Sequence, residues 1–450
     1  MIIASSESQP AVVYAGRNTG ISVENAGGIS IENLSVVGAG MTNNAGVGVL
    51  CDNTLTNGPM LEHLNLQNVE VRGFGKQGIL IDGGPAGFRH VRVSHCVVHD
   101  NLFGGIEIAG RLSWSQPGCS HADVAVAECL AYDNPGDPLC HTRHSGSGIM
   151  LLQVDRGLIE HSAAWNNGYA NGSHTGGPVG IWTCASKRVT IQRCESFRNR
   201  TTAADGGGFD IDGGCENCIL QDNYSHDNDG PGLMVYTYPY ESRPHRGNVV
   251  RFNVSENDSR RSRGYAGLWV RNDNDGIQDL EIYNNTVVAG AWTDQAASIY
   301  GEGLAACLRN NIFFARGGAV PLRVEKAQGT LRFENNLYWR EKAPVQVLWD
   351  EKIYNSLEDW RIATGAESLG GKAVGLFAES KLALHGKEAF SRRNESLRKL
   401  PTFRLSPESP AKNGGLNLRE RFGPAFASQD FNGTELSASG PWPFGAFADD

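Results

Sequence analysis

Three aspartates lie within one glycine-rich stretch of the chain, "DGGGFDIDGG", whose first residue is Asp205. Asp210 and Asp212 alternate with Phe209 and Ile211, which is the pattern of a strand that buries one face and exposes the other. We therefore expect the carboxylates of Asp210 and Asp212 to project outward, with their Cα atoms about 7 Å apart. Asp205 lies in the turn that leads into this strand, where glycine allows the backbone to turn tightly.

A fourth aspartate, Asp229, lies four residues before Leu233 of the next strand, just as Asp205 lies four residues before Phe209. If the two strands stack, Asp205 and Asp229 lie about 5 Å apart. Four carboxylates in one patch should raise at least one pKa while another group stays ionised. This combination suits glycoside hydrolysis, in which a protonated acid serves the leaving oxygen and a carboxylate activates water.

The acidic patch allows two other interpretations. Carboxylate oxygens also bind Ca²⁺, for which Asp205 and Asp229 are the candidate ligands, and we expect no other cofactor. Alternatively, Asp205 and Asp229 only cap their turns, as aspartate often does.

The elements that must position these acids are short strands that each begin with glycine and recur at intervals of 24 to 43 residues. They are "GVLCD" (48–52), "GILID" (78–82), "GIEIA" (105–109), "GIMLL" (148–152), "GIWTC" (180–184), "GFDID" (208–212), "GLMVY" (232–236) and "GLWVR" (267–271). Their alternation has a period of two, without helical periodicity between them. Such a repeat predicts a β-solenoid.

Asparagines recur in a second register, at intervals of 29 to 33 residues. They end the triplets "HDN", "YDN", "WNN", "FRN" and "HDN" as Asn101, Asn134, Asn167, Asn199 and Asn228. Because an asparagine amide can bond to the next coil, we expect these side chains to form an inner ladder. The pairs at 284–285, 310–311 and 335–336 should extend it, while Cys96, Cys129 and Cys194 should form a stack of small buried side chains.

The residues two and four places after each glycine predict two outward columns. The first runs through Leu50, Leu80, Glu107, Met150, Trp182, Asp210, Met234 and Trp269, and the second through Asp52, Asp82, Ala109, Leu152, Cys184, Asp212, Tyr236 and Arg271. We expect Trp182, Tyr236 and Trp269 to be exposed in a sugar-binding cleft, because an aromatic face packs against a sugar ring. The other candidate substrate contacts are Glu107, Arg271, His144 and His174. The alternative is that a long loop covers this face and the aromatic rings are ordinary packing.

Together these repeats resemble the right-handed parallel β-helix proteins of the pectate-lyase-like superfamily, over roughly residues 10 to 340. The resemblance implies an all-β fold with a β-helix at 1–340. Residues 341–450 should form a C-terminal cap on the last coils, because an open solenoid end exposes strand edges. Within this cap, "SLEDWRIATG" should form a turn or a short helix.

Two families of that superfamily resemble the acidic patch. In the polygalacturonase-like hydrolases, "DGGGFD" followed by "DND" (227–229) would supply the acid and the water-activating groups from Asp205, Asp227 and Asp229. The calcium-dependent lyases instead hold Ca²⁺ with acidic turns, here Asp205, Asp210, Asp212 and Asp229. In those lyases a basic residue removes the proton next to a uronate carboxylate, a role that falls here to Arg271 or Arg263.

Composition excludes several classes of partner. The formal net charge of −9 and the absence of a basic run argue against binding to nucleic acid. The sequence contains no apolar run of 18 residues that would span a membrane, and the opening "MIIASSESQPAVVYAG" lacks the features of a signal peptide. The resemblance nevertheless implies an extracellular or periplasmic protein, which we expect to be a monomer.

The ten cysteines point to no zinc centre, because the pair Cys215 and Cys218 has no second pair at zinc spacing. Cys119 and Cys140 could be bonded across the insertion that lengthens the fourth repeat. Taken together, the sequence favours a glycoside hydrolase that cleaves a polysaccharide or an oligosaccharide. A calcium-dependent polysaccharide lyase, a polymeric uronate epimerase and a non-catalytic glycan-binding β-helix are the alternatives.

Overall fold

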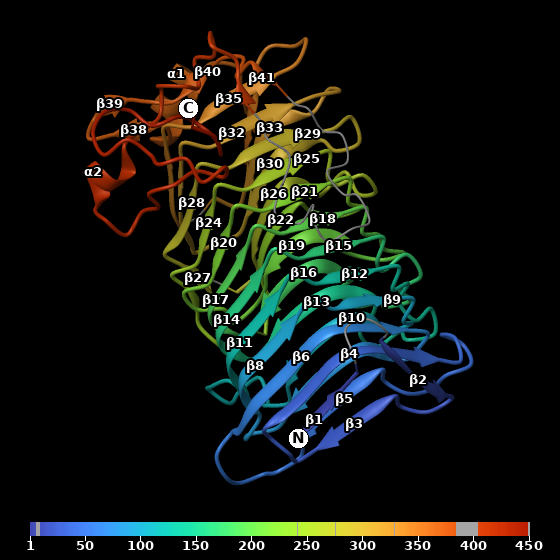
Figure 1. Cartoon of the computed structure of the whole chain (residues 1–450). Coiled ribbons are helices and arrows are strands. Elements are labelled where there is room, and N and C mark those ends of the chain that lie inside the picture. The colour runs from blue at the N-terminus through green and yellow to red at the C-terminus, as the bar shows by residue number, and fades with distance from the viewer. Residues whose placement is uncertain (6–9, 241, 275, 328, 384–403, 449–450) are drawn as a thin grey trace. The chain divides into compact units, whose positions relative to one another are not determined.

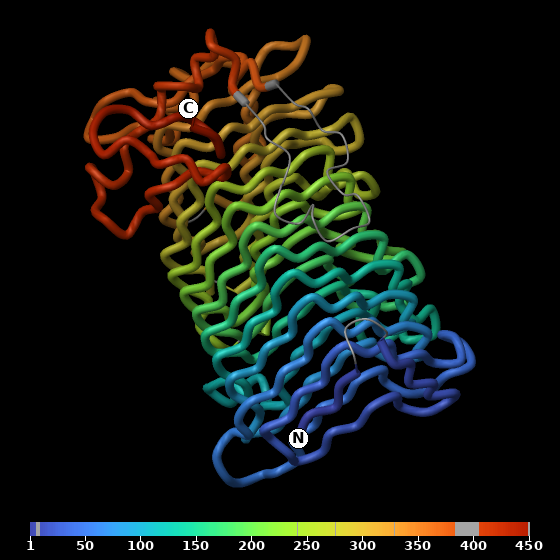
Figure 2. Tube along the Cα trace, in the orientation of Figure 1, coloured from blue at the N-terminus to red at the C-terminus, as the bar shows by residue number. Residues whose placement is uncertain are grey.

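The computed structural model describes residues 1–5, 10–240, 242–274, 276–327, 329–383 and 404–448 (Figure 1). The chain divides into two compact units. Unit 1 comprises Met1–Cys218, Asn228–Gly230 and Glu241–Arg243, and unit 2 comprises Ile219–Asp227, Pro231–Tyr240 and Pro244–Asp450. In each unit the chain winds through stacked coils, as the trace in Figure 2 shows.

The first sheet of unit 1 carries the strands that the glycine repeat predicted, and all its pairings are parallel. Its strands, in spatial order, are β3 (Ile21–Glu24), β5 (Val49–Asn53), β7 (Gln77–Gly83), β10 (Gly104–Gly110), β13 (Ser147–Leu152), β16 (Val179–Cys184) and β19 (Gly207–Ile211).

The remaining strands of each coil in unit 1 form the second layer, which is also parallel. They are β1 (Ile2–Ala4), β2 (Ala11–Gly16), β4 (Ile29–Gly38), β6 (Leu61–Arg72), β8 (Phe88–Ser94), β9 (Val97–His99), β11 (His121–Ala127), β12 (Leu130–Tyr132), β14 (Val154–Glu160), β15 (Ala163–Trp165), β17 (Lys187–Gln192) and β18 (Glu195–Phe197).

Unit 2 repeats this plan. Its first sheet contains β22 (Leu233–Thr237), β26 (Ala266–Asn272), β30 (Gln295–Tyr300), β33 (Val320–Glu325), β36 (Val347–Trp349) and β37 (Lys352–Tyr354), of which the last two pair antiparallel. Its second layer contains β20 (Ile219–Gln221), β21 (Tyr224–His226), β24 (Val249–Arg251), β25 (Val254–Glu256), β28 (Leu280–Tyr283), β29 (Thr286–Ala289), β31 (Leu304–Arg309), β32 (Ile312–Ala315), β34 (Gly329–Glu334), β35 (Leu337–Arg340) and β40 (Leu376–Phe377).

Short elements complete unit 2. They are the paired strands β23 (His245–Arg246) and β27 (Ile277–Gln278), β38 (Ser368–Leu369) and β39 (Lys372–Ala373), and β41 (Leu382–Ala383) and β42 (Arg404–Leu405), together with the helices α1 (Leu357–Thr364) and α2 (Leu418–Phe422). The predicted all-β parallel solenoid is therefore confirmed. Among the described residues, neither helix is long and apolar enough to cross a membrane.

The asparagine ladder of unit 1 is present as predicted. The amide nitrogen of Asn134 donates to Oδ1 of Asn167 at 2.9 Å, and Asn167 donates in the same way to Asn199 at 3.0 Å. The residues that precede these asparagines, such as Asp133 and Asn166, have left-handed backbone that turns the chain at this corner. Cys96, Cys129 and Cys194 are buried at the neighbouring corner, as expected.

The prediction that the later asparagine pairs extend this ladder is wrong. They belong to a second ladder, because they stand before the short strands β29, β32 and β35 rather than after them. It runs through Asn223, Asn253, Asn285, Asn311 and Asn336 with amide bonds of 2.9 to 3.0 Å. The first asparagine of each pair instead points to the C-terminal segment, where Asn284 donates to the carbonyl oxygen of Gly445 at 2.9 Å.

Glycine is required at the start of the strands in the first sheet because there is no room for a side chain. A Cβ atom on Gly78 would lie 2.7 Å from the amide nitrogen of Asn101, and one on Gly180 would lie 2.6 Å from that of Asn199. A side chain at these positions would therefore collide with the ladder. The glycine repeat and the asparagine repeat therefore have one cause, because each glycine packs directly against an asparagine of the ladder.

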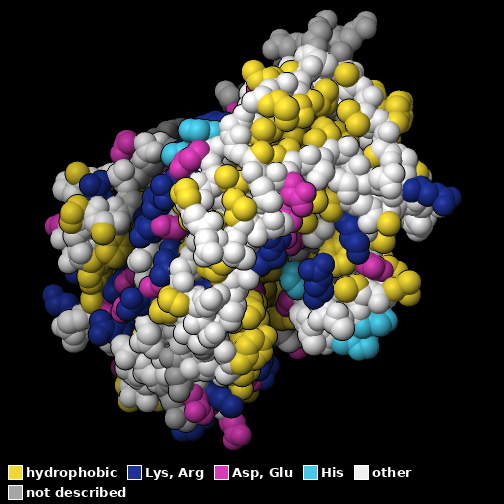
Figure 3. Space-filling model, turned by 90° about the horizontal axis from the view of Figure 1, so that it is seen from below, with side chains coloured by type: hydrophobic (Ala, Val, Ile, Leu, Met, Phe, Trp, Pro, Cys, Tyr) yellow, Lys and Arg dark blue, Asp and Glu magenta, His cyan; other side chains and the backbone are white. Residues whose placement is uncertain are grey.

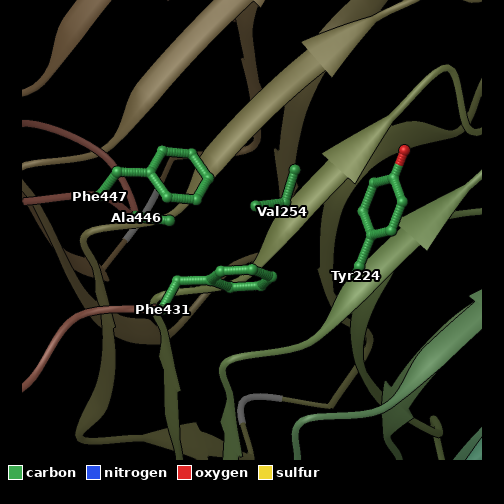
Figure 4. Close-up of a cluster of buried hydrophobic side chains, with 5 residues drawn as sticks. All are labelled: Tyr224, Val254, Phe431, Ala446 and Phe447. Atoms are coloured by element: carbon green, nitrogen blue, oxygen red, sulfur yellow. The ribbon is translucent and has the colours of Figure 1, made fainter. Parts of the chain in front are cut away.

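The C-terminal region packs on the coils of unit 2. In helix α1, Trp360 is fully buried against the rings of Phe333, Tyr338 and Trp349, so the helix predicted in "SLEDWRIATG" covers the last coil. Further along, Phe431 and Phe447 lie with Tyr224 and Val254 in one buried cluster (Figure 4).

Candidate active site

The outward face of unit 1's first sheet aligns the residues that the sequence placed in its first column. Glu107 of β10 pairs with Met150 of β13, Met150 with Trp182 of β16, and Trp182 with Asp210 of β19. Neighbouring strands in a sheet lie about 4.8 Å apart, so Trp182 directly adjoins Asp210, whereas Glu107 lies about 14 Å away.

Asp210 is a buried acid in this column. Its side chain is only 1% exposed, and its Oδ1 atom makes no hydrogen bond to another described residue. Burial raises the pKa of Asp210 well above its usual value, and the charges of Asp212 and Asp205 raise it further. The three carboxylates are therefore close enough to interact, and Asp210 holds its proton more tightly than an exposed aspartate does.

Asp205 and Asp229 are half-buried, and each accepts a backbone N–H from the preceding coil. Oδ2 of Asp205 accepts from Gly177 at 2.7 Å, and Oδ2 of Asp229 accepts from Thr201 at 3.2 Å. Asp205 itself has left-handed backbone, with φ of 56°. Both residues thus support turns, as the capping interpretation predicted, and their catalytic or calcium-binding roles stay predictions.

Asp212 follows β19 and is buried beside Asp210. Its Oδ1 atom accepts the N–H of Gly213 at 2.8 Å, which fixes the orientation of the carboxylate. Phe209 and Ile211 are fully buried, as predicted, but Asp210 and Asp212 are buried as well. The prediction that these two acids lie on an exposed face of the strand is therefore wrong, because both faces of β19 are covered.

The prediction that Trp182 is exposed is wrong. Its side chain is 5% exposed, because His144 from the loop before β13 packs edge-on against its ring, with 5.2 Å between centroids. Burial and the nearby charge of Arg143 lower the pKa of His144 to about 4, so this imidazole is neutral at pH 7. Neither Nε1 of Trp182 nor Nδ1 of His144 has a hydrogen-bond partner among the described residues.

Glu107 lies in the same column, three strands away from Asp210. Burial raises its pKa, although the hydrogen bond from Nε2 of Gln77, at 2.6 Å, and the charge of Arg143 oppose that rise. Gln77 was not among the predicted site residues. It stands directly before Gly78, which begins the strand, so the period of two extended backwards by one step marks it. Arg143 lies in a loop without a repeat, so no sequence signal marked it.

His174 lies apart from Trp182 on an exposed loop. Its ring is 4.8 Å from that of His141, whose Nδ1 atom lies 2.8 Å from the carbonyl oxygen of Gly172. The backbone of His174 donates to the carbonyl oxygen of His141, so the two loops run together. His174 stays a predicted substrate contact.

The insertion after β10 is held by one arginine. Arg243 is buried and donates to the carbonyl oxygens of Gly118 at 2.9 Å and Gln116 at 2.8 Å. The predicted bond between Cys119 and Cys140 is absent, since both are free thiols. Their sulfur atoms instead face carbonyl oxygens of different loops, those of Ala185 and Arg143.

In unit 2, Tyr236 pairs with Arg271 on the outward face of β22 and β26. Trp269 is 9% exposed, so its predicted exposure is also wrong, because the ring of Tyr265 packs edge-on against it at 5.1 Å. Although burial opposes its charge, Arg271 has a raised pKa, since it donates to Asp273 at 2.9 Å.

Arg271 also lies over the ring of Tyr300, at 4.4 Å from the centroid. A guanidinium held in this way stays protonated and is a poor base. Arg263, the other predicted base, pairs with Asp294 at 2.8 Å.

On the face seen in Figure 3, the described basic side chains lie interspersed with acidic ones. Unit 1 contains such pairs, for example Arg111 between Asp52 and Asp82 at 2.9 and 2.6 Å.

Comparison with known proteins agrees with this fold. A family model described as "Right handed beta helix region" matches residues 55–249. This match and the stacked parallel coils agree with the right-handed parallel β-helix fold that the sequence resemblance predicted. Comparison with curated protein sequences found no match.

Three solved structures similar to this chain carry the following names. A GH136 lacto-N-biosidase from Eubacterium ramulus is 17% identical, with a TM-score of 0.45 over 70% of this chain, which spans 51% of that protein's length. Pectate lyase Pel9A is 16% identical, with a TM-score of 0.48 over 98% of this chain and 87% of that one. The A-module of the Azotobacter vinelandii mannuronan C-5 epimerase AlgE6 is 12% identical, with a TM-score of 0.45 over 82% and 90%.

Proposed function

We propose that the chain is a carbohydrate-active enzyme, a glycoside hydrolase that works through Asp210 and its neighbouring carboxylates. The observation that supports this proposal is Asp210, a buried acid whose pKa is raised by burial and by the charges of Asp212 and Asp205. General acid catalysis at a glycosidic oxygen uses a carboxylic acid with a raised pKa and a second carboxylate nearby.

In this mechanism Asp210 donates its proton to the leaving glycosidic oxygen. Asp205, which is more exposed than Asp212, accepts a proton from the attacking water, and its bond from Gly177 holds it in place. Asp212 stabilises the positive charge that develops on the sugar ring. The product has inverted configuration, because water attacks from the face opposite the leaving group.

Trp182 and His144 stay predicted substrate contacts. Nε1 of Trp182 and Nδ1 of His144 are buried in this structure, so a glycan reaches them only when the loop that carries His144 moves away from Trp182. Glu107 contacts the glycan at a more distant subsite, since its distance of about 14 Å from Asp210 excludes direct proton transfer.

The test is a screen of defined neutral and acidic polysaccharides for new reducing ends, followed by the Asp210→Asn variant on any substrate found. We expect Asp210→Asn to lower kcat by about 10²–10⁴-fold, the usual contribution of a general acid. Asp82→Asn is the matched control, because Asp82 also lies on an outward column, four strands away, and pairs with Arg111.

A folded Asp210→Asn protein with full activity would contradict the proposal. Products that absorb as unsaturated uronates, formed only without chelator, would instead identify a calcium-dependent lyase. Location outside the cytoplasm and the monomeric state stay predictions from the resemblance.

A further inference from the structure

Two histidines, an aspartate and an arginine form a column on the second layer of unit 1, and each of them has left-handed backbone. His63 of β6, His90 of β8, Asp123 of β11 and Arg156 of β14 occupy equivalent positions, with φ between 55° and 63°. Because the same backbone conformation recurs on stacked strands, the side chains stack as well. The rings of His63 and His90 are 5.0 Å apart and inclined by 18°.

Glu62 joins this histidine pair. Its Oε2 atom lies 2.7 Å from Nδ1 of His90, and the ligand-type atoms of Glu62, His63 and His90 all lie within 4.8 Å of one another. All three side chains are exposed. Two imidazoles and one carboxylate are ligands that Zn²⁺ prefers, at about 2.0–2.2 Å from the metal, so a small closing movement would complete the set.

The surroundings of His90 provide the outer support that zinc ligands usually have. Its second nitrogen, Nε2, lies 3.9 Å from Oδ2 of Asp123, and Arg156 holds that carboxylate with bonds of 2.6 and 2.9 Å. When a metal takes Nδ1, the proton of His90 is on Nε2 and faces Asp123. A carboxylate that orients a metal-bound histidine in this way raises metal affinity.

A surface cavity of about 550 Å³ adjoins the histidines and is lined by His63, His90, Arg92 and Asp123, among others. Arg89 approaches the other oxygen of Glu62, Oε1, at 4.0 Å, and leaves Oε2 directed at His90. We propose that Glu62, His63 and His90 bind one Zn²⁺ ion that bridges β6 and β8 and keeps one position open to this cavity.

The experiment is calorimetric titration of the full chain, without a histidine tag, with Zn²⁺. We expect one saturable equivalent with micromolar affinity, weakened at least about tenfold by His63→Gln or His90→Gln and about tenfold by Asp123→Asn. His95→Gln is the matched control, since His95 is also exposed and pairs with a glutamate, Glu128, at 3.3 Å.

A second readout is thermal stability. Zinc should raise the melting temperature of the wild-type chain but not that of His90→Gln, whose melting temperature without zinc shows that it is folded. The proposal fails if no saturable equivalent binds, if either histidine variant binds like the wild type, or if His141→Gln removes the binding instead.

Discussion

The side chain of Glu367 bonds to Asn336, the last residue of the asparagine ladder in unit 2. The protonation of Glu367 should therefore change the stability of the C-terminal region that packs on this unit. Its buried carboxylate accepts bonds from Nδ2 of Asn336 at 2.8 Å, the backbone N–H of Asn335 at 2.6 Å and the hydroxyl of Tyr338 at 2.8 Å. Burial raises the pKa of Glu367 from 4.5 to about 7, although these bonds favour the charged form and oppose the rise.

Protonation of Glu367 stabilises the folded state, because the folded protein binds this proton more tightly than the unfolded chain does. Since the folded pKa exceeds the unfolded value, the contribution to stability is complete below pH 4.5 and is lost as the pH rises through about 7. The difference between 4.5 and 7 corresponds to about 3 kcal/mol at roughly 1.4 kcal/mol per pKa unit.

The perturbation is Glu367→Gln, which removes the titrating proton. The free energy of unfolding of the variant, relative to the wild type, should increase by about 3 kcal/mol between pH 4.5 and pH 8. Urea titration followed by tryptophan fluorescence measures this difference, because Trp360 packs on Tyr338 beside Glu367. Glu358→Gln, on the exposed side of α1, is the control and should leave the pH dependence unchanged. Parallel pH profiles of Glu367→Gln and the wild type would refute the reasoning.

Two further variants test the packing between glycine and asparagine in unit 1, both by urea titration. Gly148→Ala should destabilise by about 3 kcal/mol, because its Cβ would lie 2.5 Å from the carbonyl oxygen of Gly180, whereas Gly84→Ala has open space around it and should be nearly neutral. Asn167→Ala should cost about 3 kcal/mol, since it leaves two N–H donors of Asn134 without their acceptor; an effect below about 1 kcal/mol would mean that the ladder does not stabilise the coils.

The strands and the outward columns could be predicted from the sequence because the solenoid repeats one contact in every coil. A glycine that faces an asparagine must recur once per coil, so both residues appear at the coil's period. Once Gly180 and Gly208 fix the starts of β16 and β19, a period of two places Trp182 next to Asp210, which the register confirms.

The environment of those columns could not be predicted in the same way, because loops that differ from coil to coil determine it. His144 covers Trp182 from a loop without a repeat, and Arg243 fixes the insertion from more than 120 residues away in sequence. The alternation did not predict the histidine pair of β6 and β8, because His63 and His90 have left-handed backbone that interrupts the period of two.

The chemistry proposed for Asp210 depends on burial by the surrounding strands as well as on Asp205 and Asp212 of its own glycine-rich stretch. The largest cause of its raised pKa is burial, and part of the covering surface is the column itself, where Trp182 is the adjoining residue and Met150 follows on the next strand. Replacing Met150 or Trp182 by aspartate would add a charge to the column and remove apolar surface next to Asp210. Asp210 differs from the partly exposed aspartates of the first coils, such as Asp52 and Asp82, because they pair with Arg111 whereas its Oδ1 has no such partner.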